Sequence, residues 1–449
     1  MGLKVFPAAL IVIASLVTTM ALADGVRAAD AQDLFPKIAN ISIGAAANYG
    51  DAASHARYDL NLIGMWRGWG GGVFGMRQVL QAIKALNPDI KLGKYTQVIE
   101  LNSNPGNTAT ADIYAKISSE KGPGGTGDWW ARDAAGNILS QYPGTYAVNF
   151  TRFTTPDRNG LRYPEWLARR DNDNFFAPIP EFDIWYIDNV NYRPRIDPDW
   201  DGDGVNDSRD EPWVRQAYRE GIAAYARAAK ELQPNVVLIA NVDGPGQLDA
   251  VTGDLLDPEY RGLFGGAVME GALGKNYSRE TWGSWEQTMA GYRRLMANTV
   301  EPHWVIFAGG ADPTDYKMVR YIIASALMDN GYVAINPPTD GYSSRLWFDE
   351  YDLAGKAHSK WLGRALDPPQ AEPWSNGVYR RRFENGMALV NPKGNGTATV
   401  IIEPGYRRFL GVQDPVTNNG ESVTTITLEE RDGLILVRDE YYAGLLARK

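Results

Sequence analysis

The sequence predicts a (β/α)₈ TIM barrel followed by a small antiparallel β-sandwich domain, an overall α/β fold class. Three observations favour it. Short apolar runs alternate with segments of helical periodicity over most of the chain, which is typical of parallel βαβ units. Eight such runs occur between Ile38 and Asn336, the number of strands in a barrel. Beyond Asp367 the pattern changes to short alternating strands separated by turn signals.

The eight predicted strands are rich in β-branched, aromatic and small apolar residues, as expected of parallel strands covered on both faces. They cover residues 38–44, 59–66, 90–101, 182–187, 235–241, 264–271, 303–309 and 331–336. Between the second and third strands, residues 73–86 carry apolar side chains at helical spacing, so strand, helix and strand follow one another. The barrel domain is therefore expected to span residues 36–366.

Residues 373–440 form the second predicted domain. A Pro-rich hinge, PPQAEPW, precedes it, and the turn signals ENG, KGNG, NNG and RDG separate its short strands. This pattern predicts the antiparallel sandwich. We expect the domain to brace the barrel rather than to bind substrate.

The composition argues against several classes of protein. The formal charge of −9 and the lack of a basic patch argue against a nucleic-acid partner, because basic side chains supply most of that affinity. The chain has 0 Cys and 3 His, which excludes Cys-based catalysis, thiolate zinc sites and disulfides. The chemistry is therefore expected to rest on carboxylates. The 14 Trp and 23 Tyr suit stacking on sugar rings as well as core packing.

Residues 1–29 are predicted to be a secretory signal peptide. Lys4 supplies the positive start, an uncharged run from Val5 to Ala23 supplies the apolar core, and cleavage sites of the A-x-A type follow Ala23 and Ala29. No later stretch of the sequence is apolar enough over sufficient length to span a bilayer. We expect a mature monomer that is periplasmic or secreted and has no membrane partner.

The strand at residues 182–187 ends in a polar run that begins with Asp188 and Asn189. Enzymes with a (β/α)₈ barrel place their chemistry at the carboxyl ends of the strands. Asp188 is therefore expected to act in catalysis; the alternative is that it only caps a turn. Asn189 and Asn241, which ends the next predicted strand, are expected to bind substrate.

Glu270 is the only acid in the apolar segment of the sixth predicted strand, two strands after that of Asp188. Such positions can face each other over a bound sugar, as the two carboxyl groups of a glycosidase must. The alternative for Glu270 is a structural salt bridge. Trp66 and Tyr95, at the end of the second strand and within the third, are candidates for binding substrate, and at least one of them is expected to flank the same pocket and stack on a sugar ring.

An acidic loop at residues 199–210 is expected as an insertion in the barrel after the fourth strand. Its spacing matches the twelve-residue calcium-binding loop, in which alternate carboxylates and a backbone carbonyl converge on the ion and a Gly permits a sharp turn. The predicted ligands of a structural Ca²⁺ are Asp199, Asp201, Asp203, Val205, Asp207 and Asp210. Asp210 stands where such loops usually have the longer Glu, and a solvated acidic turn is the alternative.

Five segments of the sequence carry a resemblance to a known family. They are YDLNLIGMW, EFDIWYIDNV, GAVMEG, DYKMVRYIIASALMDNGY and WFDEYD. Together they resemble glycoside-hydrolase-like family 15, a group of (β/α)₈ glycosidases, over most of residues 36–366. The resemblance, extended to barrel α-glycosidases, implies that Asp188 serves as nucleophile and Glu270 as proton donor. The acidic loop is not a feature associated with this family.

The segment WFDEYD, residues 347–352, contributes one further candidate. It follows the eighth predicted strand near the start of a helix, where acids also interact favourably with the helix dipole. A capping or substrate-binding role is therefore favoured over a catalytic one. Glu350 is the substrate-binding candidate in this segment.

Paired acids on a barrel rim favour a secreted or periplasmic glycoside hydrolase that cleaves a polysaccharide or oligosaccharide by a two-carboxylate mechanism. The first alternative is a catalytically inactive barrel that binds polysaccharide and takes part in exopolysaccharide handling. The second is a calcium-stabilised surface protein. Convergence of Asp188 and Glu270 in an aromatic-walled pocket would distinguish the enzyme from both alternatives.

Overall fold

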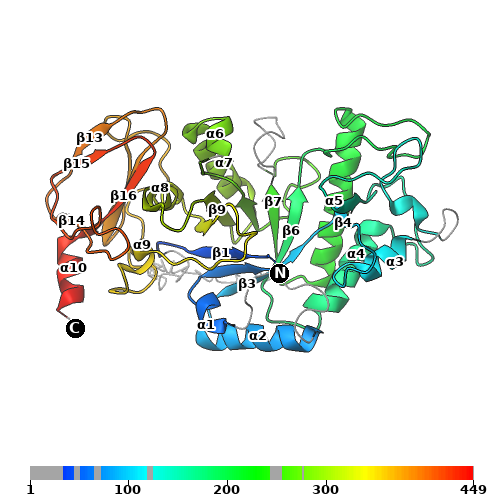
Figure 1. Cartoon of the computed structure of the whole chain (residues 1–449), viewed down its shortest axis with the longest axis horizontal. Helices are drawn as coiled ribbons and strands as arrows, with labels where there is room; N and C mark the ends of the chain where they lie inside the picture. The colour runs from blue at the N-terminus through cyan, green and yellow to red at the C-terminus, as the bar shows by residue number, and fades with distance from the viewer. Residues whose placement is uncertain are drawn as a thin grey trace, which may run out of the picture.

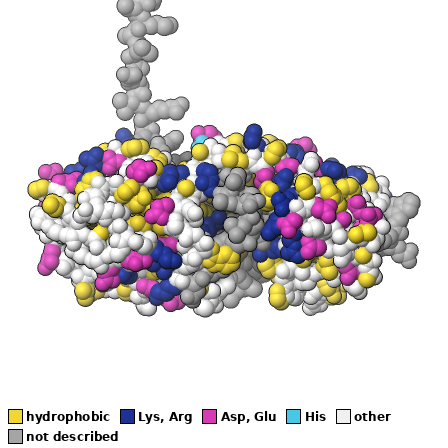
Figure 2. All heavy atoms as spheres, turned by 90° about the horizontal axis from the view of Figure 1, so that it is seen from above, with side chains coloured by type: hydrophobic (Ala, Val, Ile, Leu, Met, Phe, Trp, Pro, Cys, Tyr) yellow, Lys and Arg dark blue, Asp and Glu magenta, His cyan; other side chains and the backbone are white. Residues whose placement is uncertain are grey.

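The computed structural model of the chain is shown in Figure 1. It describes residues 34–44, 51–64, 72–118, 125–242, 255–275 and 278–447. The predicted signal peptide and the candidate Trp66 lie outside the described residues. Within these ranges, no helix has both the length and the apolar character needed to cross a membrane. Figure 2 shows acidic and basic side chains interspersed over one face of the molecule.

Eight parallel strands form the main sheet, and their order in the sheet is their order in the chain. They are β1 (Ala39–Ser42), β2 (Leu60–Ile63), β3 (Lys91–Thr96), β6 (Ile184–Val190), β7 (Val237–Val242), β8 (Gly266–Met269), β9 (Trp304–Gly310) and β10 (Tyr332–Asn336). A parallel bridge between Ile38 and Val333 brings the last strand beside the first. The sheet is thus a nearly closed barrel, and all eight predicted strands are confirmed.

The predicted third strand was too long. Its last residues form a separate strand, β4 (Glu100–Asn102), which pairs antiparallel with β5 (Thr145–Ala147). This two-stranded sheet stands apart from the barrel sheet. The apolar pattern continues through the change of direction, so periodicity alone did not reveal the break.

Alternate side chains of the barrel strands point inward and fill the barrel. This follows from the two-residue period of a strand, which sends successive side chains to opposite faces. The inward-facing cluster consists of Ala39, Ile41, Leu60, Leu62, Tyr95, Ile184, Tyr186, Ile239, Val268, Trp304, Ile306, Ala308, Tyr332 and Ala334. The barrel interior is therefore a packed core, and a substrate can reach only its ends.

Helices cover the outside of the barrel (Figure 1). The longer ones are α2 (Gly72–Leu86), α5 (Pro212–Leu232), α7 (Trp285–Asn298) and α8 (Tyr316–Ala326), and the shorter ones are α1 (Ala52–His55), α3 (Ala111–Ile117), α4 (Tyr163–Asp171), α6 (Arg279–Trp282) and α9 (Asp349–Asp352). A 3₁₀ turn, η3 (Gly127–Trp129), and a π-helical turn, η4 (Asn172–Phe176), complete the set. Helix α5 begins directly after the acidic loop, with a Pro in its first turn.

The C-terminal region contains two antiparallel sheets. The larger has the strand order β11 (Tyr379–Arg382), β12 (Gly386–Asn391), β16 (Asp432–Arg438) and β14 (Tyr406–Arg408), and the smaller pairs β13 (Ala398–Ile401) with β15 (Thr425–Leu428). A last helix, α10 (Asp439–Leu446), follows β16. The predicted antiparallel strands are confirmed, whereas their arrangement as a sandwich stays a prediction.

The C-terminal sheets are attached to the barrel through buried polar contacts. Arg381 on β11 is 1% exposed, and its guanidinium donates to the carbonyls of Leu327 and Asp329 at 3.0 and 2.7 Å. A Cβ atom on Gly433 of β16 would lie 2.6 Å from the carbonyl oxygen of Arg320 on α8, so only Gly permits this close approach. These contacts are consistent with the predicted bracing role.

Candidate active site

Asp188 and Glu270 lie next to each other at the carboxyl end of the barrel strands, and Asn241 connects them. The Asn241 Nδ2 group donates to Asp188 Oδ1 at 2.8 Å and to Glu270 Oε2 at 2.9 Å. These two carboxylate oxygens therefore lie within about 5.7 Å of each other, the sum of the two hydrogen-bond lengths. The three side chains come from β6, β7 and the end of β8, so the predicted convergence is observed.

A β-bulge in β6 aims Asp188 at this site. Ile187 pairs with Ala240 and Val190 with Val242, so two residues of β6 stand opposite Asn241 alone. Bulges of this kind redirect side chains and are common beside active sites. The second bulge residue, Asn189, has a left-handed backbone with φ of 54°, which Asn tolerates better than most residues. Its N–H donates to Asp188 Oδ1 at 2.9 Å.

Two Tyr hydroxyl groups complete the polar contacts of the pair. Tyr95 donates to Asp188 Oδ2, and Tyr342 donates to Glu270 Oε1. Burial raises the pKa of Asp188 above its usual value, and the negative charge of Glu270 raises it further. The hydrogen bonds from Tyr95 and Asn241 lower the pKa of Asp188 and so oppose both effects.

Three cavities meet at the carboxylate pair. The first has a volume of about 400 Å³ and is lined by Glu100, Tyr142, Asp188, Asn189, Asn191, Arg195, Asn241, Val242 and Glu270. The second has about 320 Å³ and contains Tyr95, Tyr186 and Tyr342 in its wall beside the same pair. The third has about 520 Å³ and is lined by Glu270 but not by Asp188. The pair therefore lies in a partly aromatic-walled site of the size that ligands occupy.

The structure places most of the predicted substrate-binding residues here. Asn189 and Asn241 line the first cavity, and Tyr95 lines the second. The Tyr95 ring packs in the barrel interior, and its hydroxyl group donates a hydrogen bond to Asp188. Its predicted stacking on a sugar ring stays a prediction.

Glu100 is a third carboxyl group of the site that we did not predict. Its Oε2 accepts a hydrogen bond from the Thr145 hydroxyl at 2.9 Å, and it lines the first cavity. Burial raises the pKa of Glu100 to about 7, and the charge of Asp188 adds to this effect. Glu100 is the only acid in an apolar run, VIEL, which is the signal that identified Glu270.

Tyr142, Arg195 and Tyr342 were also not predicted. The Tyr142 hydroxyl donates to Asn189 Oδ1 at 3.1 Å, and the Arg195 guanidinium lies 5.2 Å from the centre of the Tyr142 ring. All three residues come from loops at the carboxyl ends of the strands. Loop residues have no periodic pattern, so no local signal in the sequence identified them.

The sequence match to a known family is extensive. The model of the hypothetical glycosyl hydrolase family 15 matches residues 84–387, a range that includes Asp188, Asn241 and Glu270. The chain belongs to this family. The predicted family and the predicted class of enzyme, a glycoside hydrolase, are thereby confirmed.

Two solved structures show a distant likeness to this member of the hypothetical glycosyl hydrolase family 15. The glycoside hydrolase domain of PelA from Pseudomonas aeruginosa has 11% identity and a TM-score of 0.42, over 69% of this chain and 97% of that chain. An alpha-amylase from Lactobacillus plantarum has 11% identity and a TM-score of 0.46, over 90% and 98% of the two chains. No curated protein matches the chain.

Glu350 lies elsewhere in this family 15 protein. It is 4% exposed, and its Oε1 accepts a hydrogen bond from Asn418 Nδ2 at 3.0 Å. Its neighbour Asp349 accepts from the N–H groups of Val412 and Gln413. The structure therefore places Glu350 at the contact with the C-terminal sheets and not at the carboxylate pair, which corrects the prediction. The segment WFDEYD could not reveal this partner, because Asn418 is distant in the chain.

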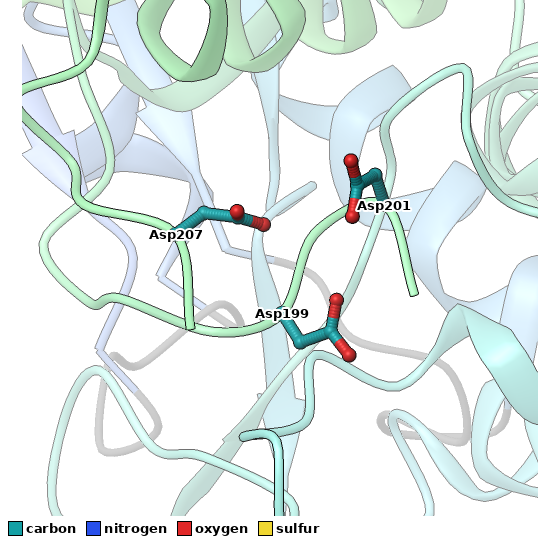
Figure 3. Close-up of side chains that lie close together, drawn as sticks. All are labelled: Asp199, Asp201 and Asp207. Carbon is teal, nitrogen blue, oxygen red and sulfur yellow. The ribbon is translucent and has the colours of Figure 1, made fainter. Parts of the chain in front are cut away.

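The acidic loop of the family 15 protein brings three predicted metal ligands together. Oxygen atoms of Asp199, Asp201 and Asp207 lie within 4.8 Å of one another, and Figure 3 shows the three side chains around a common space. The N–H groups of Gly202 and Gly204 donate to Asp199, and the positive φ angles of both glycines permit the predicted sharp turn. The three carboxylates supply the oxygen ligands that Ca²⁺ prefers.

The side chains of Asp203 and Asp210 lie outside this group of three. Asp210 forms ion pairs with Arg193 and with Arg215, the latter at 2.9 Å. Asp203 accepts a hydrogen bond from the N–H of Val205. The structure thus brings three of the six predicted ligands together, and the roles of Asp203 and of the Val205 backbone carbonyl stay predictions. Guanidinium groups from the preceding loop and from α5 neutralise Asp210, which the spacing of the acids could not indicate.

Proposed function

We propose that this protein hydrolyses a polysaccharide or oligosaccharide with retention of the anomeric configuration, with Asp188 as nucleophile and Glu270 as acid and base. The observation that supports it is the shared Asn241 amide group, which holds two carboxylate oxygens within about 5.7 Å of each other. Carboxyl groups are about 5 to 5.5 Å apart in retaining glycosidases and about 6.5 to 9.5 Å apart in inverting ones. The short separation favours direct attack by a carboxylate over attack by an intervening water.

The proposed reaction has two steps. An Asp188 oxygen attacks the anomeric carbon, the bond to the leaving oxygen breaks, and Glu270 gives its proton to that oxygen. Water then attacks the same carbon, Glu270 takes a proton from the water, and the bond to Asp188 breaks. The product keeps its anomeric configuration because the carbon is attacked twice from opposite faces.

The assignment of the two roles follows from the hydrogen bonds. Asp188 accepts from the Tyr95 hydroxyl, the Asn241 amide and the N–H of Asn189, whereas Glu270 accepts from Tyr342 and Asn241. Each donor stabilises a negative charge on the carboxylate that accepts its hydrogen bond, so the larger number of donors supports Asp188 as the ionised nucleophile.

Replacing Tyr95 with Phe is expected to move the acidic side of the pH profile of kcat/KM to higher pH. The hydroxyl group lowers the pKa of Asp188, so its removal raises that pKa and the ionised nucleophile is lost at higher pH. The profile should be measured on a substrate that the wild type cleaves. Tyr292→Phe is the matched control, because this buried hydroxyl on α7 donates to the Ala326 carbonyl instead. Identical profiles for wild type and Tyr95→Phe would contradict the assignment.

A screen of the purified mature protein against polysaccharides, with sizing of the products, tests the proposed function. The anomeric configuration of the first product, followed by NMR, tests retention. Cleavage with an initially retained anomer is expected. Binding without any cleavage would instead favour the inactive polysaccharide-binding barrel. Export of the chain to the periplasm or the medium stays a prediction.

We also propose that Asp199, Asp201 and Asp207 hold a structural Ca²⁺. In support, oxygen atoms of the three carboxylates lie within 4.8 Å of one another on a loop whose backbone N–H groups already donate to Asp199. Burial raises the pKa of Asp207, and the charges of Asp201 and Asp199 raise it further. When bound, the ion would neutralise these carboxylates and fix the loop between β6 and α5. No step of the proposed reaction involves it.

A further inference from the structure

Arg279 bridges the backbones of the two strand ends that carry Asn241 and Glu270. It is the first residue of α6, and its guanidinium donates to the Glu270 carbonyl at 3.2 Å and to the Val242 carbonyl at 3.1 Å. Val242 directly follows Asn241, whose amide group contacts both carboxylates. The Arg279 N–H also donates to the Gly271 carbonyl at 2.7 Å. Arg279 therefore fixes the backbone from which the Asn241 and Glu270 side chains project.

Helix α6 in turn is fixed by a buried carboxylate. The helix has only 4 residues, too few to be stable without tertiary contacts. Its second residue, Glu280, is 0% exposed. The Tyr321 hydroxyl of α8 donates to Glu280 Oε1, and Arg431 Nη2 lies 2.8 Å from Glu280 Oε2. A buried carboxylate is costly unless it is paired, so the position of α6 depends on these two partners.

Arg431 comes from the C-terminal region. It lies in the turn between β15 and β16, where its backbone has a left-handed φ of 54°. Its Nη2 group also donates to the carbonyl of Gly274, in the segment that follows Glu270, at 2.7 Å. The Ser278 hydroxyl donates to the same carbonyl at 3.2 Å. Arg431 thus joins α6 to the segment that follows Glu270.

We propose that Arg431 and Arg279 are positioning residues for the proton donor Glu270, so that the C-terminal region supports catalysis as well as the stability of the barrel. This inference rests on the proposed function and deepens it. Arg431 holds α6 through Glu280, and Arg279 on α6 holds the Glu270 carbonyl. Backbone hydrogen bonds to β9 retain the rest of this segment, so the loss of Arg431 displaces Glu270 without unfolding the barrel.

Two kinds of substrate that differ in their need for a proton test this role. The probes are the polysaccharides of the screen and the α- and β-glycosyl fluorides of their constituent sugars. Fluoride leaves without a proton, and kcat/KM covers only the steps up to the departure of the leaving group. Arg431→Ala is expected to lower kcat/KM on the polysaccharide about tenfold to 10²-fold, the cost of misplacing a catalytic group. On the fluoride, kcat/KM should stay within about twofold.

Arg381→Ala is the matched control. Arg381 also joins the C-terminal region to the barrel, but it donates to the carbonyls of Leu327 and Asp329. Its replacement should lower the melting temperature and leave the ratio of the two kcat/KM values unchanged. Arg431→Lys retains a positive charge that can pair with Glu280, so it should recover part of the activity on the polysaccharide.

A double variant separates the positioning role from a folding defect. Arg431→Ala leaves the Glu280 carboxylate buried without its cation, which is destabilising. Glu280→Gln combined with Arg431→Met removes both charges, and Gln keeps an oxygen that can accept from Tyr321. The same selective loss on the polysaccharide is expected in this variant.

Equal losses on polysaccharide and fluoride, no loss on the polysaccharide, or an equal selective loss in Arg381→Ala would overturn the proposal. Cleavage of neither probe by the wild type contradicts the proposed function alone. In that case, and where only one probe is cleaved, hydrogen exchange of the Arg279 amide, which donates to the Gly271 carbonyl, decides the inference. Faster exchange in Arg431→Ala than in Arg381→Ala supports it, and equal or slower exchange overturns it.

Discussion

Asp188→Asn and Glu270→Gln are each expected to lower kcat/KM by roughly 10²-fold to 10⁴-fold or more, with the barrel still folded. Each substitution keeps the size of the side chain and one carbonyl oxygen that can accept from the Asn241 amide. It removes either the attacking oxygen or the group that transfers the proton. Kinetics on a substrate from the polysaccharide screen, together with thermal unfolding, measure both effects.

Two further observations separate the roles of the pair. Glu270→Gln should retain the first step on a glycosyl fluoride, because fluoride leaves without a proton. Asp188→Gly should regain turnover on the fluoride when azide is added, and the glycosyl azide should have the inverted configuration, since azide then replaces the carboxylate. Glu350→Gln is the matched control: its carboxyl group is buried beside Asn418, so stability is expected to fall while catalysis continues. Full activity in Asp188→Asn or Glu270→Gln would refute the assignment.

Removal of Ca²⁺ is expected to lower the free energy of unfolding by about 2.7 kcal/mol when the free ion was present at a hundredfold excess over its dissociation constant. The reason is that the ion binds the folded loop alone, where Asp199, Asp201 and Asp207 converge. Chelation should lower the melting temperature by a few degrees, and added Ca²⁺ should restore it. Mg²⁺ should substitute poorly, because it prefers fewer ligands in a tighter octahedral arrangement.

Variants of the loop test whether Ca²⁺ is bound by the three converging carboxylates or by all the ligands of the twelve-residue pattern. Asp199→Asn combined with Asp201→Asn should abolish the response to chelation. Asp210→Asn should leave it intact, because Asp210 pairs with Arg193 and Arg215. A loss of the response in Asp210→Asn would support the twelve-residue pattern instead. Identical melting curves with and without chelator, with no Ca²⁺ bound in a titration, would reduce the loop to a solvated acidic turn.

Much of the architecture was predictable because strands and helices leave local periodic patterns. The eight barrel strands and the antiparallel C-terminal strands were identified in this way. Asp188 and Glu270 were identified because a charge that directly follows a buried apolar run lies at a strand end, where barrel enzymes place their chemistry. Glu100 carried the same signal. The prediction of a single strand over residues 90–101 places Glu100 inside that strand, whereas the structure divides the segment into β3, which ends at Thr96, and β4, which begins at Glu100.

The sequence by itself therefore determined the fold class, the family and the positions of the two carboxyl groups, because each depends on residues close together in the chain. Only the tertiary structure decided their partners. The Asn241 contact depends on the bulge that sets two residues of β6 opposite one of β7. Likewise, Glu350 accepts a hydrogen bond from Asn418 outside the cavity, and Asp210 forms an ion pair with Arg193. Hydrogen bonds and ion pairs between distant segments depend on distances that no local pattern encodes, and these contacts shape the site.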